Sequence, residues 1–560
     1  MKIFLAQQNY HIGNFESNKT KIIDAIKTAK SQNADLIVFS ELCVCGYPPR
    51  DFLYFNDFIN KCKTSVAEIA THTQGIGVLI GCPTPNTSPE GKDLFNSAYF
   101  ITDGKIEQVI HKTCLPTYDI FDEDRYFEQA SEWNVICFKG KRIAVTICED
   151  IWNMGNNPLY LNCPMDILIK QQPDFMVNLS ASPFDYTHDA DRKAVVKANV
   201  LQYKLPMFYC NAVGSQSEVV FDGTSLVFDK AANLCGQLAS FKEDLQGFVL
   251  NEDGTIAGDI VEAASALSSK ELNPDALNND LNIDEIYEAL LLGIKDYFSK
   301  LGFTKAIVGS SGGIDSAVTL ALACAALGKE NITAILMPSQ YSSDHSVSDA
   351  KQLSETLGNP YHIIPINNIY NGFLKELSPL FKELPFSIAE ENIQSRSRGN
   401  LLMAIANKFN YILLNTSNKS ELATGYGTLY GDMAGGIGVL GDCYKQQVFA
   451  LAKYINRNGE IIPANIINKP PSAELRPEQK DSDSLPEYEV LDNILYQYIE
   501  QTKGPDEIKT LGFDAALVDR VLKMVNMNEY KRNQFCPIIR ISPKAFGVGR
   551  RIPIVAKYLG

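Results

Sequence analysis

Three side chains in the first half of this chain are of the types that together can hydrolyse an amide. Glu41, Lys112 and Cys148 each come just after a short apolar run, namely ADLIVFS, EQVIH and KRIAVTI. A cysteine thiolate can attack an amide carbon, a glutamate can take the thiol proton, and a lysine can stabilise the oxyanion that forms. Each residue also has an ordinary explanation: a buried structural thiol for Cys148, a helix cap for Glu41 and a surface charge for Lys112.

A glycine-rich loop in the second half joins a predicted strand, KAIVG, directly to a predicted helix. Its residues are Gly309, Ser310, Ser311, Gly312, Gly313, Ile314, Asp315 and Ser316. Glycines expose backbone N–H groups and a helix amino terminus adds partial positive charge, so this loop predicts a phosphate site. The lysine of the motif G-x-x-x-x-G-K-[ST] is missing, and Asp315 instead offers a carboxylate to Mg²⁺.

Two other motifs overlap or follow this loop and suggest different chemistry. Residues 309 to 313 also satisfy G-x-S-x-G, the nucleophile elbow of α/β-hydrolases, with Ser311 as the nucleophile. That chemistry needs a histidine after a late strand, whereas the histidines after Ser311 are His345 and His362, both early in this half. Residues 436 to 441 match G-x-G-x-x-G, but no apolar strand precedes them, so a plain glycine-rich loop is the better interpretation.

The elements that must position these residues fall into two domains. Short apolar runs in residues 1–262 predict strands mixed with helices, one of them SNKTKIIDAIKTAKSQ with Ser17 as a possible cap. Residues 263–283 are small, polar and weakly periodic and predict a linker. In residues 284–560 apolar strands alternate with helical stretches, which predicts a parallel, doubly wound sheet. Residues 468–489, rich in proline and charge, predict a long loop that covers another feature.

Composition excludes several classes of protein. The 51 Lys and Arg against 66 Asp and Glu give a net charge of −15, which argues against nucleic acid as a partner. The longest apolar stretch, AVTLALACAALG, is too short for a membrane helix, and the amino terminus lacks the apolar core of a signal peptide. Thirteen cysteines without a C-x-x-C pair predict reduced thiols and hence a cytoplasmic protein. Six histidines without H-x-x-x-H spacing indicate no histidine-rich metal site.

The glycine loop resembles the pyrophosphate-binding loop of the N-type ATP pyrophosphatases. Later segments, among them EENIQSRSRGNLLMAIAN, LLNTSNKSELATGYGTLYGDMAGG, GDCYKQQVFALA and NEYKRNQF, resemble parts of the NAD synthetase family in the same order. This resemblance spans nearly all of residues 283–560.

The NAD synthetase resemblance implies roles for individual residues. Residues 309–316 with Thr416 and Lys445 would bind ATP, and Asp315 with Glu421 would bind Mg²⁺. A dinucleotide substrate, deamido-NAD, would be contacted by Asn392, Arg396, Glu421 and Lys531. Taken singly, Thr416 and Glu421 could equally cap the helix near SNKSELA, and Lys531 could be a solvated charge.

Residues 1–250 resemble the nitrilase, or carbon-nitrogen hydrolase, superfamily, in which Glu, Lys and Cys occur in this chain order. The resemblance implies an α-β-β-α sandwich with Glu41, Lys112 and Cys148 as catalytic residues and Glu123 as a support for the lysine. LPTYDIFDEDRYF and NLSASPF resemble the glutaminase domain joined to NAD synthetases, which implies glutamine contacts from Tyr118, Ser182, Phe184 and His188. Many relatives have a lysine in place of His188, so a glutamine contact there departs from the family's pattern.

Together the resemblances imply an α/β protein that releases ammonia from glutamine in one domain and uses it in the other. ATP would convert the nicotinate carboxylate of deamido-NAD to an acyl-adenylate, and ammonia would then give NAD, with AMP, pyrophosphate and glutamate as the other products. An enclosed route for ammonia and a homo-oligomeric state are further expectations. Two alternatives stay open: a related amidotransferase with another carboxylate acceptor, and a binding or scaffold protein with inactive forms of both domains.

Overall fold

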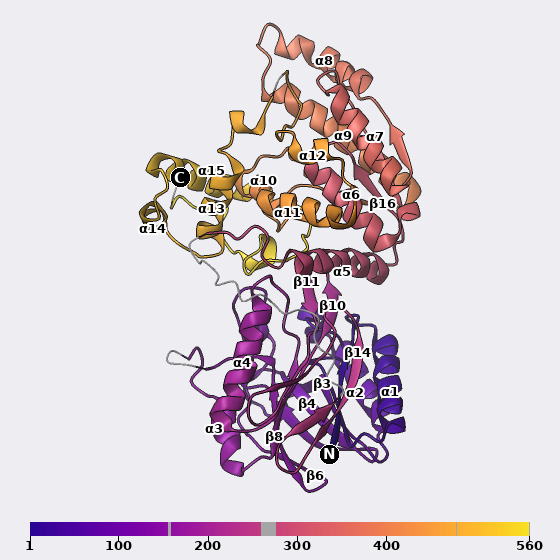
Figure 1. The fold of residues 1–560 in the computed structure, drawn as a ribbon, viewed down its shortest axis with the longest axis vertical. Helices are drawn as coiled ribbons and strands as arrows, with labels where there is room; N and C mark the ends of the chain where they lie inside the picture. The colour runs from indigo at the N-terminus through magenta and orange to yellow at the C-terminus, as the bar shows by residue number, and fades with distance from the viewer. Residues whose placement is uncertain (155–157, 259–275, 478, 559–560) are drawn as a thin grey trace. The chain divides into compact units, whose positions relative to one another are not determined.

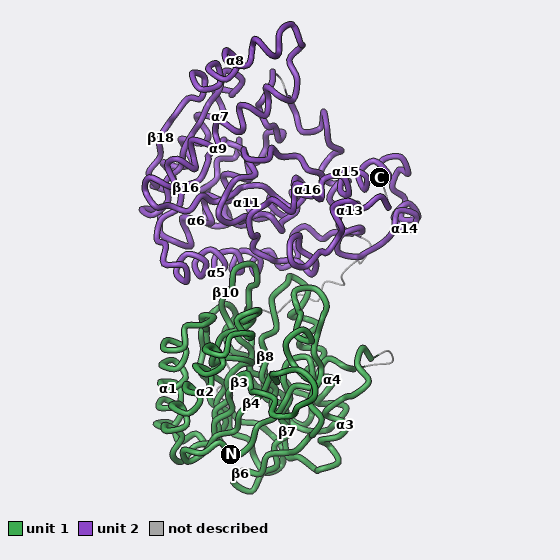
Figure 2. Tube along the Cα trace, turned by 180° about the vertical axis from the view of Figure 1, so that it is seen from behind, with its two compact units in different colours: residues 1–268 green, residues 269–560 purple. Residues whose placement is uncertain are grey.

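The computed structural model describes residues 1–154, 158–258, 276–477 and 479–558. The chain divides into two compact units, Met1–Ser268 and Ser269–Gly560 (Figure 2). Of the predicted linker, residues 263–275 lie outside the described residues. The backbone N–H of Leu277 donates to Asn493 Oδ1 at 2.9 Å, so this end of the predicted linker is held by unit 2.

Within residues 1–258, unit 1 contains two large mixed sheets and a hairpin of β10 and β11 (Figure 1). The strand orders are β15-β14-β1-β2-β3-β4-β5 and β13-β12-β9-β8-β7-β6. Each sheet has a parallel centre, β1-β2-β3 in the first and β7-β8-β9 in the second. The strands are β1 (Lys2–Gln7), β2 (Leu36–Phe39), β3 (Gly77–Pro85), β4 (Leu94–Thr102), β5 (Lys105–His111), β6 (Ile136–Phe138), β7 (Lys141–Ile147), β8 (Phe175–Ser180), β9 (Met207–Asn211), β10 (Val213–Gln216), β11 (Val219–Asp222), β12 (Leu226–Phe228), β13 (Leu234–Gln237), β14 (Asp244–Leu250) and β15 (Ile256–Gly258).

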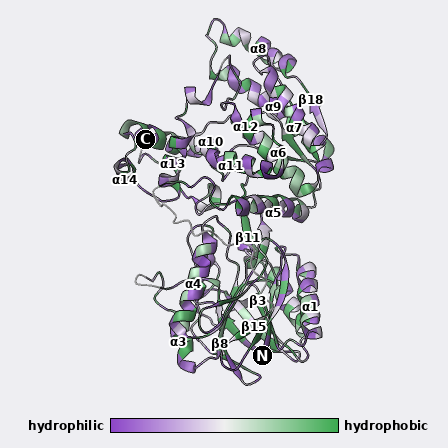
Figure 3. Ribbon diagram, in the orientation of Figure 1, coloured by the Kyte–Doolittle hydropathy of each residue, from purple (hydrophilic) through white to green (hydrophobic). Residues whose placement is uncertain are grey.

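Helices cover the outer face of each large sheet. Alternation along a strand sends Phe4 outward to pack with Ile22 of α1, while Ile3 packs inward against the second sheet. Met176 on the outer face of the second sheet packs with Val196 of α4. Unit 1 is therefore an α-β-β-α sandwich, and its predicted fold is confirmed. Figure 3 shows the buried strands β3 and β8 largely in the hydrophobic colour. The helices are α1 (Phe15–Ser31), α2 (Asn56–Ala70), α3 (Pro164–Leu168) and α4 (His188–Tyr203).

The cap of α1 differs from the prediction. Asn14 is the N-cap, and its side chain accepts from the backbone N–H of Ser17 at 3.3 Å. Ser17 is therefore in the first turn, and the prediction of Ser17 as cap is wrong. Asparagine caps a helix as well as serine does, so spacing alone did not separate the two.

Within residues 276–558, unit 2 is built on a parallel sheet with the order β18-β17-β16-β19-β20. The chain first moves outward from β16 on one side and then returns to the other side, as a doubly wound sheet requires, so this prediction is also confirmed. The switch point lies where the carboxyl ends of β16 and β19 adjoin, the usual place for a ligand. The strands are β16 (Ala306–Gly309), β17 (Ile332–Leu336), β18 (Tyr361–Ile363), β19 (Ile412–Asn415) and β20 (Ile437–Gly438).

Helices of unit 2 pack on this sheet and form a second core beside it. Leu402 and Ala406 of α9 pack against Ile307 and Ile335 of the sheet, and Leu491, Val521 and their neighbours join α13 to α15. Among the helices that the structure describes, none is long and apolar enough to cross a membrane. The helices are α5 (Ile283–Leu301), α6 (Ile314–Leu327), α7 (Asp344–Leu357), α8 (Asn367–Phe381), α9 (Ile388–Phe409), α10 (Lys419–Thr424), α11 (Lys445–Ile455), α12 (Ala464–Asn468), α13 (Tyr488–Ile499), α14 (Pro505–Thr510), α15 (Ala515–Met527) and α16 (Glu529–Arg532).

Candidate functional site

Cys148 lies on a strained turn at the carboxyl end of a central strand of unit 1. β7 ends at Ile147, Cys148 has φ +43°, and a 3₁₀ turn, η3 (Cys148–Ile151), follows at once. A positive φ is costly for a residue with a side chain and persists only where the surroundings hold it. Cys148 is 4% exposed, and burial, followed by the charge of Glu41, raises the pKa of its thiol well above the ordinary value. Deprotonation of this thiol therefore needs a base and a nearby positive charge.

Lys112 supplies that positive charge between two buried carboxylates. Its Nζ donates to Glu41 Oε1 at 2.7 Å and to Glu123 Oε1 and Oε2 at 2.9 and 2.7 Å. Burial lowers the pKa of Lys112, but the charges of Glu123 and Glu41 outweigh burial and raise that pKa well above its ordinary value. Lys112 is thus a permanent cation, because its two anionic neighbours stabilise the charged form.

Further buried groups fix the two carboxylates. Asn96 Nδ2 and the backbone N–H of Ala181 donate to Glu41 at 2.7 and 3.1 Å. Tyr47 donates its hydroxyl to Glu123 Oε1 at 2.7 Å, and burial raises the pKa of Glu123. Neither Asn96 nor Tyr47 occurs in a motif, and only the fold brings them to the carboxylates, so they could not be found from the sequence.

The residues predicted to contact glutamine lie around the same turn. Tyr118 donates its hydroxyl to both oxygens of Glu149 at 2.9 Å, and burial raises the pKa of Glu149 to about 7. His188 Nε2 lies 2.8 Å from Ser182 Oγ, and the imidazole stacks on the indole of Trp152 at 4.9 Å. His188 is therefore held by two neighbours within unit 1, Ser182 and Trp152.

Phe184 is the fourth predicted glutamine contact. Its side chain is 2% exposed and packs edge to face on Phe241, and its backbone N–H donates to Val220 O at 2.7 Å. Phe184 thus forms a fixed apolar part of this region.

The glycine loop of unit 2 follows β16 at the switch point of the parallel sheet. Gly312 has φ +82°, and a Cβ at this position would lie 2.2 Å from the backbone oxygen of Ser346, so both its conformation and its space demand glycine. Ser311 Oγ accepts from the Gly313 N–H at 3.2 Å and lies 3.1 Å from Ser316 Oγ. α6 starts immediately afterwards, which directs its amino terminus at the loop.

The structure does not favour the hydrolase motif at residues 309–313 or the dinucleotide motif at residues 436–441. The described partners of Ser311 Oγ are the loop's own Gly313 and Ser316, and its context is that of a phosphate loop. In the run 436–441, a Cβ on Gly438 would meet Phe535 at 2.8 Å and one on Gly441 would meet Ile538 at 2.3 Å. These glycines therefore permit close packing, as a plain glycine-rich loop does.

Asp315, Glu421 and Lys445 lie together beside the glycine loop. Lys445 Nζ donates to Asp315 Oδ2 at 2.6 Å and lies 3.5 Å from Glu421 Oε1, and Asn418 Nδ2 donates to Asp315 Oδ1 at 2.8 Å. Burial, followed by the charge of Asp315, raises the pKa of Glu421 to about 8. Asn418 also caps α10, which carries Glu421, so one residue positions both carboxylates.

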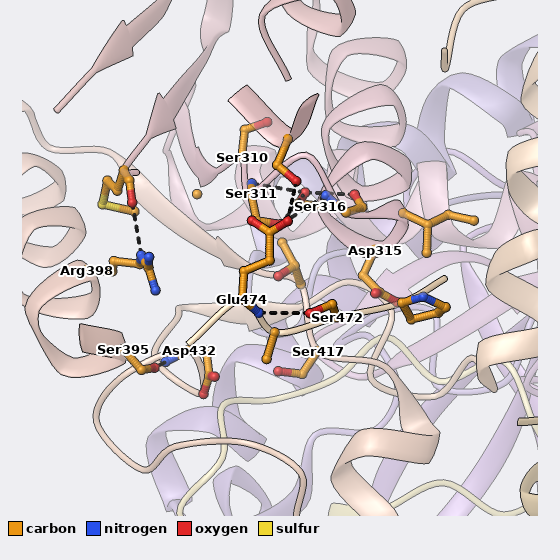
Figure 4. A pocket seen from close by; sticks show the side chains of 18 of the residues that line it. Ser310, Ser311, Asp315, Ser316, Ser395, Arg398, Ser417, Asp432, Ser472 and Glu474 are labelled. Carbon is orange, nitrogen blue, oxygen red and sulfur yellow. Dashed lines mark hydrogen bonds between the residues drawn. The ribbon is translucent and has the colours of Figure 1, made fainter. Parts of the chain in front are cut away.

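A cavity of about 290 Å³ opens beside these three residues. It is lined by the glycine loop, by Thr416 and by part of the loop predicted over residues 468–489. Arg398, Asp432 and Glu474 enter it from different elements, as Figure 4 shows. Arg398 Nε donates to Met337 O at 3.0 Å, and Glu474 accepts from the Ser343 and Ser346 hydroxyls at 2.8 Å. Sequence reasoning missed these three residues, although Arg398 and Asp432 stand in quoted motifs.

The other residues predicted for deamido-NAD hold one segment, residues 425–429. Asn392 Oδ1 accepts from the Thr428 hydroxyl at 2.7 Å, and Arg396 Nε donates to Leu429 O at 3.2 Å. Lys531 Nζ donates to Gly425 O and Gly427 O at 2.7 and 2.8 Å. None of these three side chains is among the described residues that line the cavity. The structure thus joins them to each other through this segment, Asn392 by the Thr428 hydroxyl and the other two by backbone oxygens.

The acidic pair of unit 2 fits a magnesium ion. Mg²⁺ prefers oxygen ligands and is commonly held by one or two carboxylates together with substrate phosphates and water. Asp315 and Glu421 offer two carboxylates next to a predicted phosphate site. Lys445 balances part of their negative charge. The described residues contain no group of three or more His, Cys, Asp or Glu side chains that could hold a metal ion by itself.

The fold and the two sites define a class: a nitrilase-like unit with a buried Glu-Lys-Cys group, followed by a doubly wound unit with a phosphate loop. Comparison with family models agrees, since residues 2–251 match the carbon-nitrogen hydrolase family and residues 286–535 match the NAD synthase family. The chain belongs to the family of glutamine-dependent NAD(+) synthetases.

Individual relatives match along almost the whole chain. The glutamine-dependent NAD(+) synthetase of Synechocystis sp. is 43% identical over 565 residues, which cover 99% of each chain. That of Thermotoga maritima is 39% identical over 100% of this chain and 99% of its own. The solved structure of the Acinetobacter baumannii enzyme with ADP has a TM-score of 0.77 at 38% identity, covering 99% of this chain and 98% of its own.

Proposed function

We propose that the protein amidates deamido-NAD to NAD with ammonia that it releases from glutamine, at the expense of ATP. The observation that carries the proposal is that one chain holds both a buried Glu41-Lys112 pair beside Cys148 and a glycine loop whose Asp315 bonds Lys445. Full-length likeness to relatives named glutamine-dependent NAD(+) synthetases supports it.

In unit 1 the thiol of Cys148 attacks the side-chain amide carbon of glutamine. Glu41 takes the thiol proton and delivers a proton to the leaving nitrogen, which departs as ammonia and leaves a thioester on Cys148. Lys112 faces the oxyanion that forms, and Glu123 keeps Lys112 in place. Water then hydrolyses the thioester to glutamate. Tyr118, Ser182, Phe184 and His188 are the proposed glutamine contacts.

In unit 2 the nicotinate carboxylate of deamido-NAD attacks the α-phosphorus of ATP, which forms an acyl-adenylate and releases pyrophosphate. Ammonia then attacks the acyl carbon, and AMP leaves. The glycine loop, Thr416 and Lys445 would hold the ATP phosphates, since they surround the cavity with N–H groups and positive charge. Asn392, Arg396, Glu421 and Lys531 are the proposed contacts to deamido-NAD.

Mg²⁺ is part of the proposal, with Asp315 and Glu421 as its protein ligands. Bound there, it would offset the negative charge that gathers on pyrophosphate as it departs. Lys445 balances the charge of the same two carboxylates when the ion is absent.

The proposal includes three further properties. Ammonia passes between the active sites without release, because free ammonia at neutral pH is mostly protonated and no longer nucleophilic. The protein is a homo-oligomer, in keeping with the family resemblance. It works in the cytoplasm, and its thirteen free cysteines support a reducing location.

The test is a product assay with glutamine, ATP, Mg²⁺ and deamido-NAD, repeated with ammonium in place of glutamine. We expect NAD, glutamate, AMP and pyrophosphate in equal amounts. In Cys148→Ala, glutamine-driven NAD formation falls by more than about 10⁴-fold because the nucleophile is gone, whereas ammonium-driven formation persists. The matched control is Cys137→Ala, which removes an exposed thiol from the same unit.

Several outcomes would contradict the proposal. Release of ADP and phosphate excludes the adenylate. Loss of both activities in Cys148→Ala argues against separable sites. Amidation of another carboxylate in preference to deamido-NAD would establish the related amidotransferase instead, and absence of glutamine hydrolysis would favour a binding protein.

A further inference from the structure

Asp150 is a buried carboxylate to which neither the motifs nor the proposed reaction assigns a task. It is 2% exposed, lies two residues after Cys148, and does not contact Lys112 among its described hydrogen bonds. Burial raises the pKa of Asp150 to about 6, although three backbone N–H donors oppose that rise. A buried carboxylate that accepts three backbone hydrogen bonds needs an explanation in the fold or in the site.

The three bonds of Asp150 join two distant parts of the chain. Asp150 Oδ2 accepts from the Ile147 N–H at 2.9 Å, across the turn that holds Cys148. Asp150 Oδ1 accepts from the N–H groups of Thr113 and Cys114 at 2.9 and 2.8 Å. The first bond alone would be an ordinary cap of a 3₁₀ turn, but the other two reach back 37 and 36 residues to the segment that follows Lys112.

We propose that Asp150 is a positioning residue that sets the Cys148 thiol relative to the Lys112 ammonium for the hydrolysis of glutamine. The proposal rests on the proposed function of unit 1. One carboxylate is bonded to the residue before the thiol and to the two residues after the lysine, so neither segment can shift without the other. This linkage also explains how Cys148 keeps its positive φ, because a strained conformation survives only where surrounding bonds determine it.

Replacement of Asp150 by asparagine removes this linkage at nearly constant volume. An amide has a single acceptor oxygen, so it can serve Ile147 or the pair Thr113 and Cys114, and its NH₂ group then faces a backbone donor on the other side. A buried N–H loses its partner and the turn relaxes away from Lys112. A shift of about 1 Å at a reacting group lowers a rate by about 100-fold.

Asp174→Asn is the matched control. Asp174 Oδ2 accepts from the Arg142 N–H at 2.7 Å, so it bonds the backbone at the start of β7 as Asp150 does at its end. Asp174 lies at the end of the strand away from Cys148, and an asparagine there keeps an acceptor oxygen for this one backbone bond. The control therefore makes the same change of residue type without breaking a linkage or reaching the thiol.

The experiment compares both variants with the unmodified protein in glutamine-driven and ammonium-driven NAD formation. We expect Asp150→Asn to lower kcat with glutamine by about 100-fold while KM for glutamine changes by less than about threefold. Ammonium-driven formation stays unchanged, and Asp174→Asn behaves as the unmodified protein.

Iodoacetamide labelling, read by peptide mass, separates positioning from unfolding. Cys43, Cys45, Cys62, Cys82 and Cys210 are 0% exposed in unit 1 and stay unlabelled if Asp150→Asn only moves the turn. Labelling of these thiols would show that the residue merely stabilises the fold and would overturn the inference. So would a kcat within about threefold of the unmodified value, or a raised KM with kcat unchanged. Lack of glutamine-driven activity in the unmodified protein would instead refute the proposed function, and the inference with it.

Discussion

Each unit uses one lysine and two carboxylates, but the two groups differ in what surrounds them. In unit 1 the side chains of Lys112, Glu41 and Glu123 are 0%, 0% and 5% exposed. In unit 2 the side chain of Lys445 is 2% exposed, whereas Asp315 and Glu421 are each 17% exposed at the wall of a cavity.

The difference follows from what each group must do. A sealed group has all its charges paired by protein, so its geometry is fixed before any substrate arrives and its field is strong in a medium of low dielectric. An open group leaves carboxylate oxygens available to a ligand that comes from outside. A lysine with two carboxylates is therefore a group with all its charges paired in unit 1 and a group open to a ligand in unit 2.

Removal of the lysine from each group is the strongest way to test this comparison. Lys112→Met leaves Glu41 and Glu123 buried without a cation and is expected to destabilise unit 1 by about 3–5 kcal/mol, with loss of glutamine-driven activity. Lys445→Met is expected to cost much less stability, because water or a cation can reach Asp315 and Glu421. The measurement is the unfolding temperature of each unit by calorimetry. If the two variants lower the unfolding temperature of their units equally, the difference in exposure does not affect stability.

A third carboxylate in unit 1 sharpens the comparison through pH. Glu149 is bonded to tyrosine hydroxyls and not to a lysine, and burial raises its pKa to about 7 from 4.5. The folded state therefore holds this proton more tightly than the unfolded state, so the stability it contributes is present below about pH 4.5 and is lost as pH rises through 7.

Glu149→Gln should remove that dependence. Between pH 5 and pH 8 the unmodified protein should lose roughly 2–3 kcal/mol of unit 1 stability that the variant keeps. Unfolding temperatures measured at unit pH steps provide the check, with the exposed Glu376→Gln as control. A pH profile that is the same for both proteins would show that Glu149 does not titrate in this range.

The open group of unit 2 can be tested through its proposed metal. Glu421→Gln removes one proposed Mg²⁺ ligand and should raise the Mg²⁺ concentration for half-maximal ammonium-driven activity by at least about tenfold. Glutamine hydrolysis by unit 1, measured as glutamate release, should not change its Mg²⁺ requirement. If the Mg²⁺ requirement of NAD formation stays the same, Glu421 is not a ligand and its role is to balance Lys445.

The fold class could be predicted from the sequence because it depends on patterns that lie close together along the chain. Alternating apolar runs and the loop after KAIVG indicate strands and helices without knowledge of distant partners. The apolar spacing of SNKTKIIDAIKTAKSQ predicts its helix in the same way. It does not distinguish a cap at Ser17 from the observed cap at Asn14, because both residues suit an N-cap.

The supporting residues could not be predicted, because they act through contacts between distant segments. Asn96 is 55 residues from Glu41 in the chain and Asn418 is 103 residues from Asp315, yet each donates a short hydrogen bond to its carboxylate. Asn418 belongs to the segment LLNTSNKSELATG, which resembles the NAD synthetase family, but nothing in that segment identifies Asp315 as its partner. Which asparagine meets which carboxylate is decided by strand order, and a single sequence does not specify that order.

The glycine at position 312 has a consequence for the tolerance of this site to mutation. Its φ of +82° disfavours every other residue, and a single added methyl group would press within 2.2 Å of the Ser346 backbone. These are independent demands, so no change elsewhere in the loop can relieve both. In a library of all single substitutions selected for growth without external NAD, we expect position 312 to accept no replacement. The backbone of the loop and the backbone of α7 are in direct contact there, which leaves no room for a side chain.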